Sequence, residues 1–322
     1  MAKSGPGLRR GDASGSGALL AISGERGPAL IRGAALLGLI GLTLAWGLNW
    51  PIMKFSLREL SPLYFRAATM TGGALLLLAW FSASGRDMRL PRGAWLPVAA
   101  LALPNVLGWH LFSILGVQEL ASGRAAILGF TMPIWTTVLA VLFFGERLTP
   151  RVVFGAASAA AAIALLVAQE FTSLAGRPLG ILWMQIAALS WALGTILMRR
   201  SRLALSTPAI TVWMMLLSSL GFWLLAPLAE PWPTWRFSAP MWLALAWGVA
   251  INYGIAQVVW FNLARTLPPT ASAFSIMAVP LVGTVSAIAI VGEVPRWQDW
   301  AAAAFVILAI ASALLRRPSP SP

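Results

Sequence analysis

The chain has 322 residues, of which 59% are hydrophobic and only 10% are charged. Soluble proteins carry about 25% charged residues, so this composition excludes an ordinary soluble domain and requires a surface that faces lipid. The net charge of +13 does not indicate nucleic-acid binding, because the basic residues are scattered instead of forming one stripe. Cysteine is absent, which excludes disulfides and thiolate metal sites.

The chain begins with a basic segment, residues 1–32, that is rich in Gly, Ser and Arg. We expect it to be a disordered cytoplasmic arm, and we expect residues 316–322, with their Pro-Ser repeat, to be a disordered cytoplasmic tail. Between them lie ten apolar runs of about the length of a spanning helix. They cover residues 33–53, 63–82, 94–115, 123–144, 151–169, 179–198, 208–229, 240–261, 270–291 and 298–315. The runs are continuous instead of alternating, so the predicted fold is an all-α integral membrane protein.

The distribution of the basic residues predicts the orientation. With the N-terminus inside and the spans alternating, most of the 23 Lys and Arg residues fall on the inner side. This satisfies the positive-inside rule and places both termini in the cytoplasm. We expect a multi-pass protein of the bacterial cytoplasmic (inner) membrane, whose partners are the lipid bilayer and a small-molecule substrate.

Four features occur twice, about 146 residues apart, which is typical of transporters built from two repeats. The pairs are Pro133 with Pro280, Gly145-Glu146 with Gly292-Glu293, Trp46 with Trp191, and Asn105 with Asn252. We assign the first repeat to residues 33–169 and the second to residues 170–315. Five helices per repeat is an odd number, so the second repeat enters the membrane from the opposite side. The sequence therefore predicts ten transmembrane helices as two inverted five-helix repeats around a central cavity.

The stretch from Ala121 to Gln169 carries a family resemblance. It reads ASGRAAILGFTMPIW, then FFGERLTPR, and it resembles the EamA-type repeat of the drug/metabolite transporter superfamily. Arg66, which follows Ser61-Pro62 in the second span, also fits that pattern, and we expect it to have a structural or gating role. The second half departs from it at Val212, opposite Arg66, and at Val294-Pro295. The resemblance implies transport of amino acids, other metabolites or drugs, with YddG-like amino-acid exporters as the suggested comparison.

The paired prolines and Gly-Glu pairs have predicted structural and gating roles. Pro133 and Pro280 each remove a backbone donor, so we expect each helix to kink near mid-membrane. Gly145-Glu146 lies just past a helix end, and Thr149-Pro150 suits the start of the next helix. We therefore expect Glu146 and, equally, Glu293 to order loops or form salt bridges instead of binding substrate.

Polar residues within the third and eighth spans are the first candidates for substrate binding. Asn105 and His110 recur in the second half, at the same spacing, as Asn252 and Gln257, and Tyr253 adds a hydroxyl beside Asn252. Polar side chains are costly against lipid, so we expect these residues to face the protein interior. Substrate contact and bonding between helices remain alternatives.

Deep aromatic and amphipathic residues are the second group of candidates. Trp46, Trp109, Trp135, Trp191 and Met277 lie away from the span ends, and Asn49 lies beside Trp50-Pro51 near the end of the first span. They suit the wall of a cavity for small amphiphilic solutes, with core packing as the alternative.

The predicted function is export of small metabolites, chiefly amino acids that are aromatic or otherwise neutral, by alternating access. No carboxylate lies in the interior of a predicted span, so we expect transport to be facilitative, with His110 as the alternative coupling group. A broad exporter of lipophilic drugs is the alternative function, and an integral-membrane enzyme is the second alternative. The chain has no HExxH or GxSxG motif. We expect no catalytic residue, cofactor or metal, no nucleic-acid partner, and a monomer.

Overall fold

The computed structural model describes residues 27–145, 147–172, 177–260 and 269–314. These residues form helices, turns and loops without a β-strand, which confirms the all-helical prediction. The predicted arm and tail lie outside the described residues, apart from the start of α1 within residues 27–32. The chain divides into two compact units, Met1–Leu37 and Gly38–Pro322.

The helical elements are labelled in chain order, with η1 a 3-10 helix and η2 and η3 π-helices. They are α1 (Gly27–Ser56), α2 (Pro62–Ala83), η1 (Arg92–Ala94), α3 (Trp95–Ala102), η2 (Leu103–Gly108), α4 (Trp109–Glu119), α5 (Ser122–Gly129), α6 (Met132–Phe144), α7 (Pro150–Thr172), α8 (Pro178–Arg200), α9 (Thr207–Ala229), α10 (Ala239–Ala246), η3 (Trp247–Ile255), α12 (Pro269–Val291) and α13 (Trp297–Leu314).

Eight described segments are long and apolar enough to cross a membrane, so the chain is a multi-pass membrane protein. They are Leu36–Ser56, Pro62–Ala83, Arg92–Glu119, Ser122–Phe144, Pro150–Phe171, Pro178–Arg200, Thr207–Ala229 and Ala239–Trp260. Each matches a predicted run to within a few residues. In the part of the chain that the structure describes, the last two apolar stretches, Met277–Val291 and Trp297–Ser312, are shorter. The count of ten spans therefore stays a prediction.

Many helices begin with a proline in the first turn, where its missing N–H costs nothing. Thr149 precedes Pro150, and its hydroxyl accepts a hydrogen bond from Val152 N (3.4 Å), as expected for a helix start. Ser206 and Ser238 begin α9 and α10 in the same way, accepting from backbone N–H groups three residues later at 3.3 Å.

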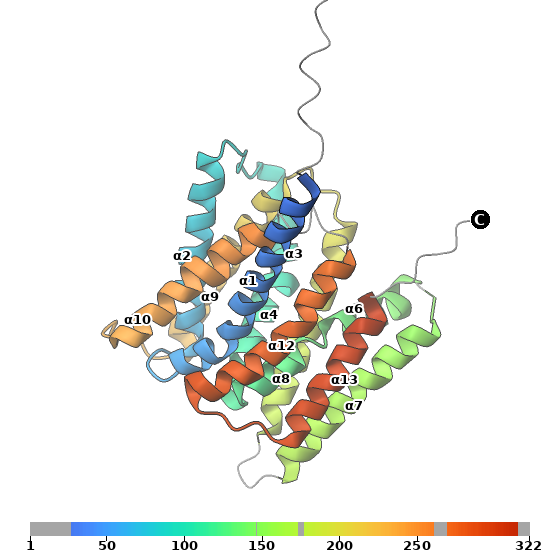
Figure 1. The fold of residues 1–322 in the computed structure, drawn as a ribbon. Coiled ribbons are helices and arrows are strands. Elements are labelled where there is room, and N and C mark those ends of the chain that lie inside the picture. Colours follow the sequence, from blue (N-terminus) through green and yellow to red (C-terminus); the bar gives the residue numbers. More distant parts are fainter. Residues whose placement is uncertain (1–26, 146, 173–176, 261–268, 315–322) are drawn as a thin grey trace, which may run out of the picture. The chain divides into compact units, whose positions relative to one another are not determined.

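Helices far apart in the sequence pack as neighbours within residues 38–322. In Figure 1, α7 and α13 lie side by side, and these two helices share an extensive contact. Helix α2 packs against α9 and η3, α4 packs against α8, and α5 packs against α12. The largest fully buried side chains include Tyr64, Phe65, Phe222, Met53 and Met70. The core therefore includes helices of both predicted repeats.

The two paired prolines have different surroundings. The span that contains Pro133 is broken into α5 and α6 at Phe130-Thr131, and Pro133 sits at the start of α6. Pro280 lies inside α12, which continues through it. In both places a threonine four residues later donates its hydroxyl to the proline carbonyl, Thr137 at 3.0 Å and Thr284 at 2.9 Å. The broken span in the first half supplies a local interruption that the second half does not share.

Candidate functional site

Two π-helices mark the third and eighth spans. Asn105 lies in η2 and Asn252 lies in η3, so each π-helix carries one of the paired asparagines. π-Helical turns are rare and are frequently found at functional sites. Asn252 is buried, whereas Asn105 and Gln257 are partly exposed. Asn105 also packs directly on Gly194 of α8, where no side chain separates the backbones.

A buried polar cluster joins α2, α4 and η3, and it contains Arg66, Ser113, His110 and Tyr253. Arg66 Nη1 donates to the Tyr253 hydroxyl (3.1 Å), and Nη2 donates to Ser113 Oγ (3.2 Å). The His110 ring lies 5.4 Å from the Tyr253 ring. The structure thus brings together two residues predicted for the cavity, His110 and Tyr253, with Arg66, which was predicted for a structural or gating role. Ser113 was not predicted.

Aromatic residues of α1, α4 and α8 form a second cluster. The Trp109 and Trp191 rings lie 4.5 Å apart, and Trp50 lies edge-on to Trp109 (6.3 Å) and to Phe130 (6.4 Å). Trp109 and His110 are successive residues of α4, so they point to different faces of that helix. One face of α4 therefore meets the aromatic cluster and the next meets the polar cluster.

The other predicted wall residues have separate partners. Trp46 lies 5.7 Å from Trp260, centroid to centroid. Trp135 Nε1 donates to Gln185 Oε1 (2.9 Å), which also accepts from Thr131 (3.3 Å). Asn49 and Met277 are buried. Gln185 is a polar residue of α8 that the sequence analysis missed, because it lacks a matching residue in the first half.

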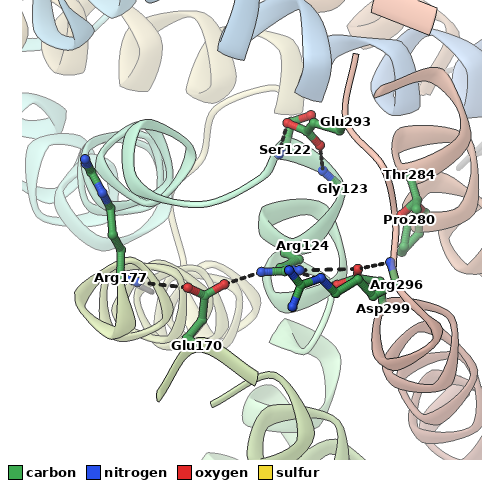
Figure 2. Close-up of polar contacts among 10 residues, drawn as sticks. All are labelled: Ser122, Gly123, Arg124, Glu170, Arg177, Pro280, Thr284, Glu293, Arg296 and Asp299. Atoms are coloured by element: carbon green, nitrogen blue, oxygen red, sulfur yellow. Dashed lines mark hydrogen bonds and ion pairs between the residues drawn. The ribbon is translucent and has the colours of Figure 1, made fainter. Parts of the chain in front are cut away.

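The two Gly-Glu pairs end spans, and one of them is fully described. Gly145 and Gly292 have φ of +72° and +74°, the left-handed conformation that glycine adopts at helix ends. The Glu293 carboxylate accepts from the backbone N–H groups of Ser122 (2.6 Å) and Gly123 (3.2 Å) at the start of α5. Figure 2 shows this contact above the Arg124 network. Glu146 lies outside the described residues.

An ionic network below the Glu293 contact was missed by the sequence analysis. Arg124 of α5 pairs with Glu170 of α7 and with Asp299 of α13, whose Oδ1 lies 2.6 Å from Arg124 Nε (Figure 2). Both carboxylates are buried, and each also accepts a backbone N–H, from Arg177 (2.8 Å) and Arg296 (2.7 Å) respectively. The network ties α5 to α7 and α13 and leaves neither carboxylate unpaired.

Further polar contacts join one set of helix ends. At these ends α1, α4, α7, α9 and α12 finish, and α2, α5, α8, α10 and α13 begin. We call this the linked end. Glu230 accepts from Leu63 N (2.9 Å) and Tyr64 N (3.2 Å), so it covers the N-terminus of α2. Lys54 Nζ donates to the Val117 and Gln118 carbonyls at 2.8 and 2.9 Å.

Two further polar contacts at the linked end are exposed to solvent. Arg177 pairs with Glu119 at 3.0 Å. Glu59 accepts from the Ser238 side chain and from its backbone N–H, and these bonds hold the pKa of Glu59 below its ordinary value. Together with the Glu293 and Arg124 contacts, these bonds connect the helix ends of both halves.

The polar cluster depends on close packing of α2 on η3. A Cβ added at Gly73 overlaps the Tyr253 side chain, so Gly73→Val is expected to destabilise the protein by about 1–3 kcal/mol. The measurement is chemical unfolding in mixed detergent micelles. Gly41→Val is the matched control, because a Cβ at Gly41 meets nothing within 4 Å. Equal effects of the two substitutions contradict the prediction.

Known proteins match this chain in sequence and in fold. A model of the EamA-like transporter family matches residues 33–168 and 178–315, one match in each half. The chain is similar to the uncharacterized transporter YoaV of Bacillus subtilis, with 23% identity over 77% of this chain and 85% of that protein. It is also similar to the uncharacterized inner membrane transporter YedA of Escherichia coli, with 24% identity over 84% and 88%. A solved structure titled "Crystal structure of protein" aligns with a TM-score of 0.62 and 21% identity over 88% of this chain and 97% of that one, which indicates a shared fold.

Proposed function

The chain belongs to the EamA-like transporter family, and from this membership we propose that it exports small metabolites, chiefly neutral amino acids, by alternating access. The observation that carries the proposal is the separate family match in each half. Transporters made of two repeats place the substrate between them near mid-membrane. We further propose that the repeats are inverted, that the termini are cytoplasmic, and that the protein works as a monomer in the bacterial inner membrane without a cofactor.

The two clusters support an amphiphilic substrate. Arg66, His110 and Tyr253 offer polar groups, while Trp109 and Trp191 offer aromatic surface on the neighbouring face of α4. A few placed polar groups beside a broad apolar wall suit a small solute with one polar end. Neutral amino acids have that character. We therefore propose that Arg66 contacts the substrate, in place of the structural or gating role predicted from the sequence.

Alternating access requires contacts that open and close. The linked end is held by hydrogen bonds and ion pairs between helix ends, several of which are partly exposed. We infer that the described state is closed at this end and that the end lies on the outer side of the membrane. Export then requires α5 and α12 to separate after substrate binds from the cytoplasm.

A broad exporter of lipophilic drugs is the weaker candidate. Such an exporter needs a buried carboxylate free to meet a cation or a proton. Glu170 and Asp299 are buried, but Arg124 and backbone N–H groups already occupy them. The contacts of these two acids therefore favour a structural role over coupling.

Purified protein in proteoliposomes is expected to take up several radiolabelled neutral amino acids without an imposed ion gradient. Uptake without a gradient supports facilitative transport, because among the residues that the structure describes no unpaired carboxylate lies inside a span to supply coupling. A His110→Gln variant is measured in parallel, and its pH dependence is expected to equal that of the wild type. Proton-driven dye efflux without amino-acid uptake contradicts the proposal and favours the drug exporter.

A further inference from the structure

Arg66 is a buried cation whose partners are neutral. Its residue is 3% exposed, and in the described part of the chain no carboxylate lies within ion-pair distance of it. A guanidinium has five N–H donors, of which Tyr253 and Ser113 accept two. The Nε donor is buried without a partner. A buried charge without a counter-ion is costly, so this arrangement indicates that Arg66 pairs with an anion other than the described carboxylates.

The groups around Arg66 have unused hydrogen-bonding capacity that suits an anion. Ser113 has no donor to spare, because its hydroxyl accepts from Arg66 and donates its proton to the His110 carbonyl (3.3 Å). The Tyr253 hydroxyl accepts from Arg66, which leaves its own proton available. His110 Nδ1 is buried without a hydrogen bond, although the residue as a whole is partly exposed. The cluster therefore holds spare donors and borders accessible space at His110.

We propose that Arg66, with the Tyr253 hydroxyl beside it, binds the carboxylate of the transported substrate. This inference rests on the proposed function and narrows it to substrates that carry one carboxylate. A single guanidinium with hydroxyl neighbours matches a monoanion, since planar carboxylates pair with the guanidinium through parallel N–H donors. A phosphate dianion calls for further cations, and among the described residues none contacts Arg66.

The two halves of the chain differ at the position of Arg66. Val212 occupies the place in α9 that Arg66 occupies in α2, and it is fully buried. The cation is therefore present once in the pair of repeats. One carboxylate site off the pseudo-two-fold axis fixes a single orientation of the substrate.

The test is ligand binding to purified protein, read by the fluorescence of its 17 tryptophans, which does not depend on transport. The probes are phenylalanine and phenylalaninamide, which differ in the carboxylate alone, together with 3-phenylpropionate, which lacks the amino group. Wild type is expected to bind both carboxylates about ten-fold more tightly than the amide, the value for one charge-assisted bond. Arg66→Gln is expected to abolish that preference, and Arg66→Lys to keep part of it.

Arg199→Gln is the matched control, because it removes one positive charge from an exposed helix end. It is expected to retain the ten-fold preference. If Arg66→Gln does not fold, Tyr253→Phe replaces it, and loss of the hydroxyl donor is expected to weaken carboxylate binding several-fold without affecting the amide. A folded Arg66→Gln that still prefers carboxylates overturns the inference, as does a wild type that binds amide and acid equally. Carboxylate binding without any uptake into proteoliposomes contradicts the proposed function but supports the carboxylate site at Arg66.

Discussion

Replacing Arg124 by methionine is expected to reduce the free energy of unfolding by about 3–5 kcal/mol, because it strands two buried carboxylates. Glu170 and Asp299 then keep one backbone N–H each, from Arg177 and Arg296. Each backbone bond is shorter than 3 Å but brings no full positive charge. The loss is measured by chemical unfolding of the purified protein in mixed detergent micelles.

Arg177→Met is the matched control for this prediction. Arg177 pairs with Glu119, but its side chain is 61% exposed, and surface ion pairs contribute about 0–1 kcal/mol. A second variant replaces Arg124 by Met, Glu170 by Gln and Asp299 by Asn together, and it is expected to recover most of the lost stability, since no uncompensated charge remains. Equal losses for Arg124→Met and Arg177→Met show that the network contributes no more than a surface pair.

The helices were largely predictable, whereas the network around Arg124 was not. Apolar runs predict spanning helices because a helix needs about 20 apolar residues to cross the bilayer. Arg124 meets partners 46 and 175 residues away, and each partner looked from the sequence like an ordinary polar residue at a span edge. Such pairings depend on which helices pack together, and a single sequence carries little information on that.

The polar cluster was predicted in part. His110 and Tyr253 were found because polar residues are costly in lipid, and repeat symmetry paired His110 with Gln257. Ser113 was missed because a serine in a helix commonly bonds its own backbone. The π-helices around Asn105 and Asn252 were also missed, since neither stretch has a local pattern that distinguishes a π-turn from an α-turn. Symmetry therefore located candidate positions, while the partners required the packed helices.

Joining α5 to α12 with a reversible disulfide is expected to stop transport. A Cβ built at Gly123 lies 3.4 Å from the Thr284 Cβ, close to the roughly 3.5–4.5 Å of a disulfide. The chain has no native cysteine, so the Gly123→Cys, Thr284→Cys pair is the sole source of thiols. Oxidation is expected to reduce amino-acid uptake by more than about ten-fold, because a covalent link prevents the two helices from separating. Reduction is expected to restore uptake.

A second disulfide pair distinguishes a gate between α5 and α12 from a general effect of making the protein more rigid. Gly155→Cys with Ser312→Cys joins α7 to α13, which pack along one another and where the Ser312 hydroxyl lies against Gly155. If α5 and α12 move while α7 and α13 travel together, this second link leaves uptake intact. Binding read by tryptophan fluorescence gives the remaining distinction, since a protein locked at the linked end still receives substrate from the opposite side. Retained binding with lost uptake assigns the linked end to gating, whereas undiminished uptake in the oxidised Gly123–Thr284 variant rules out separation of α5 and α12 as a step of transport.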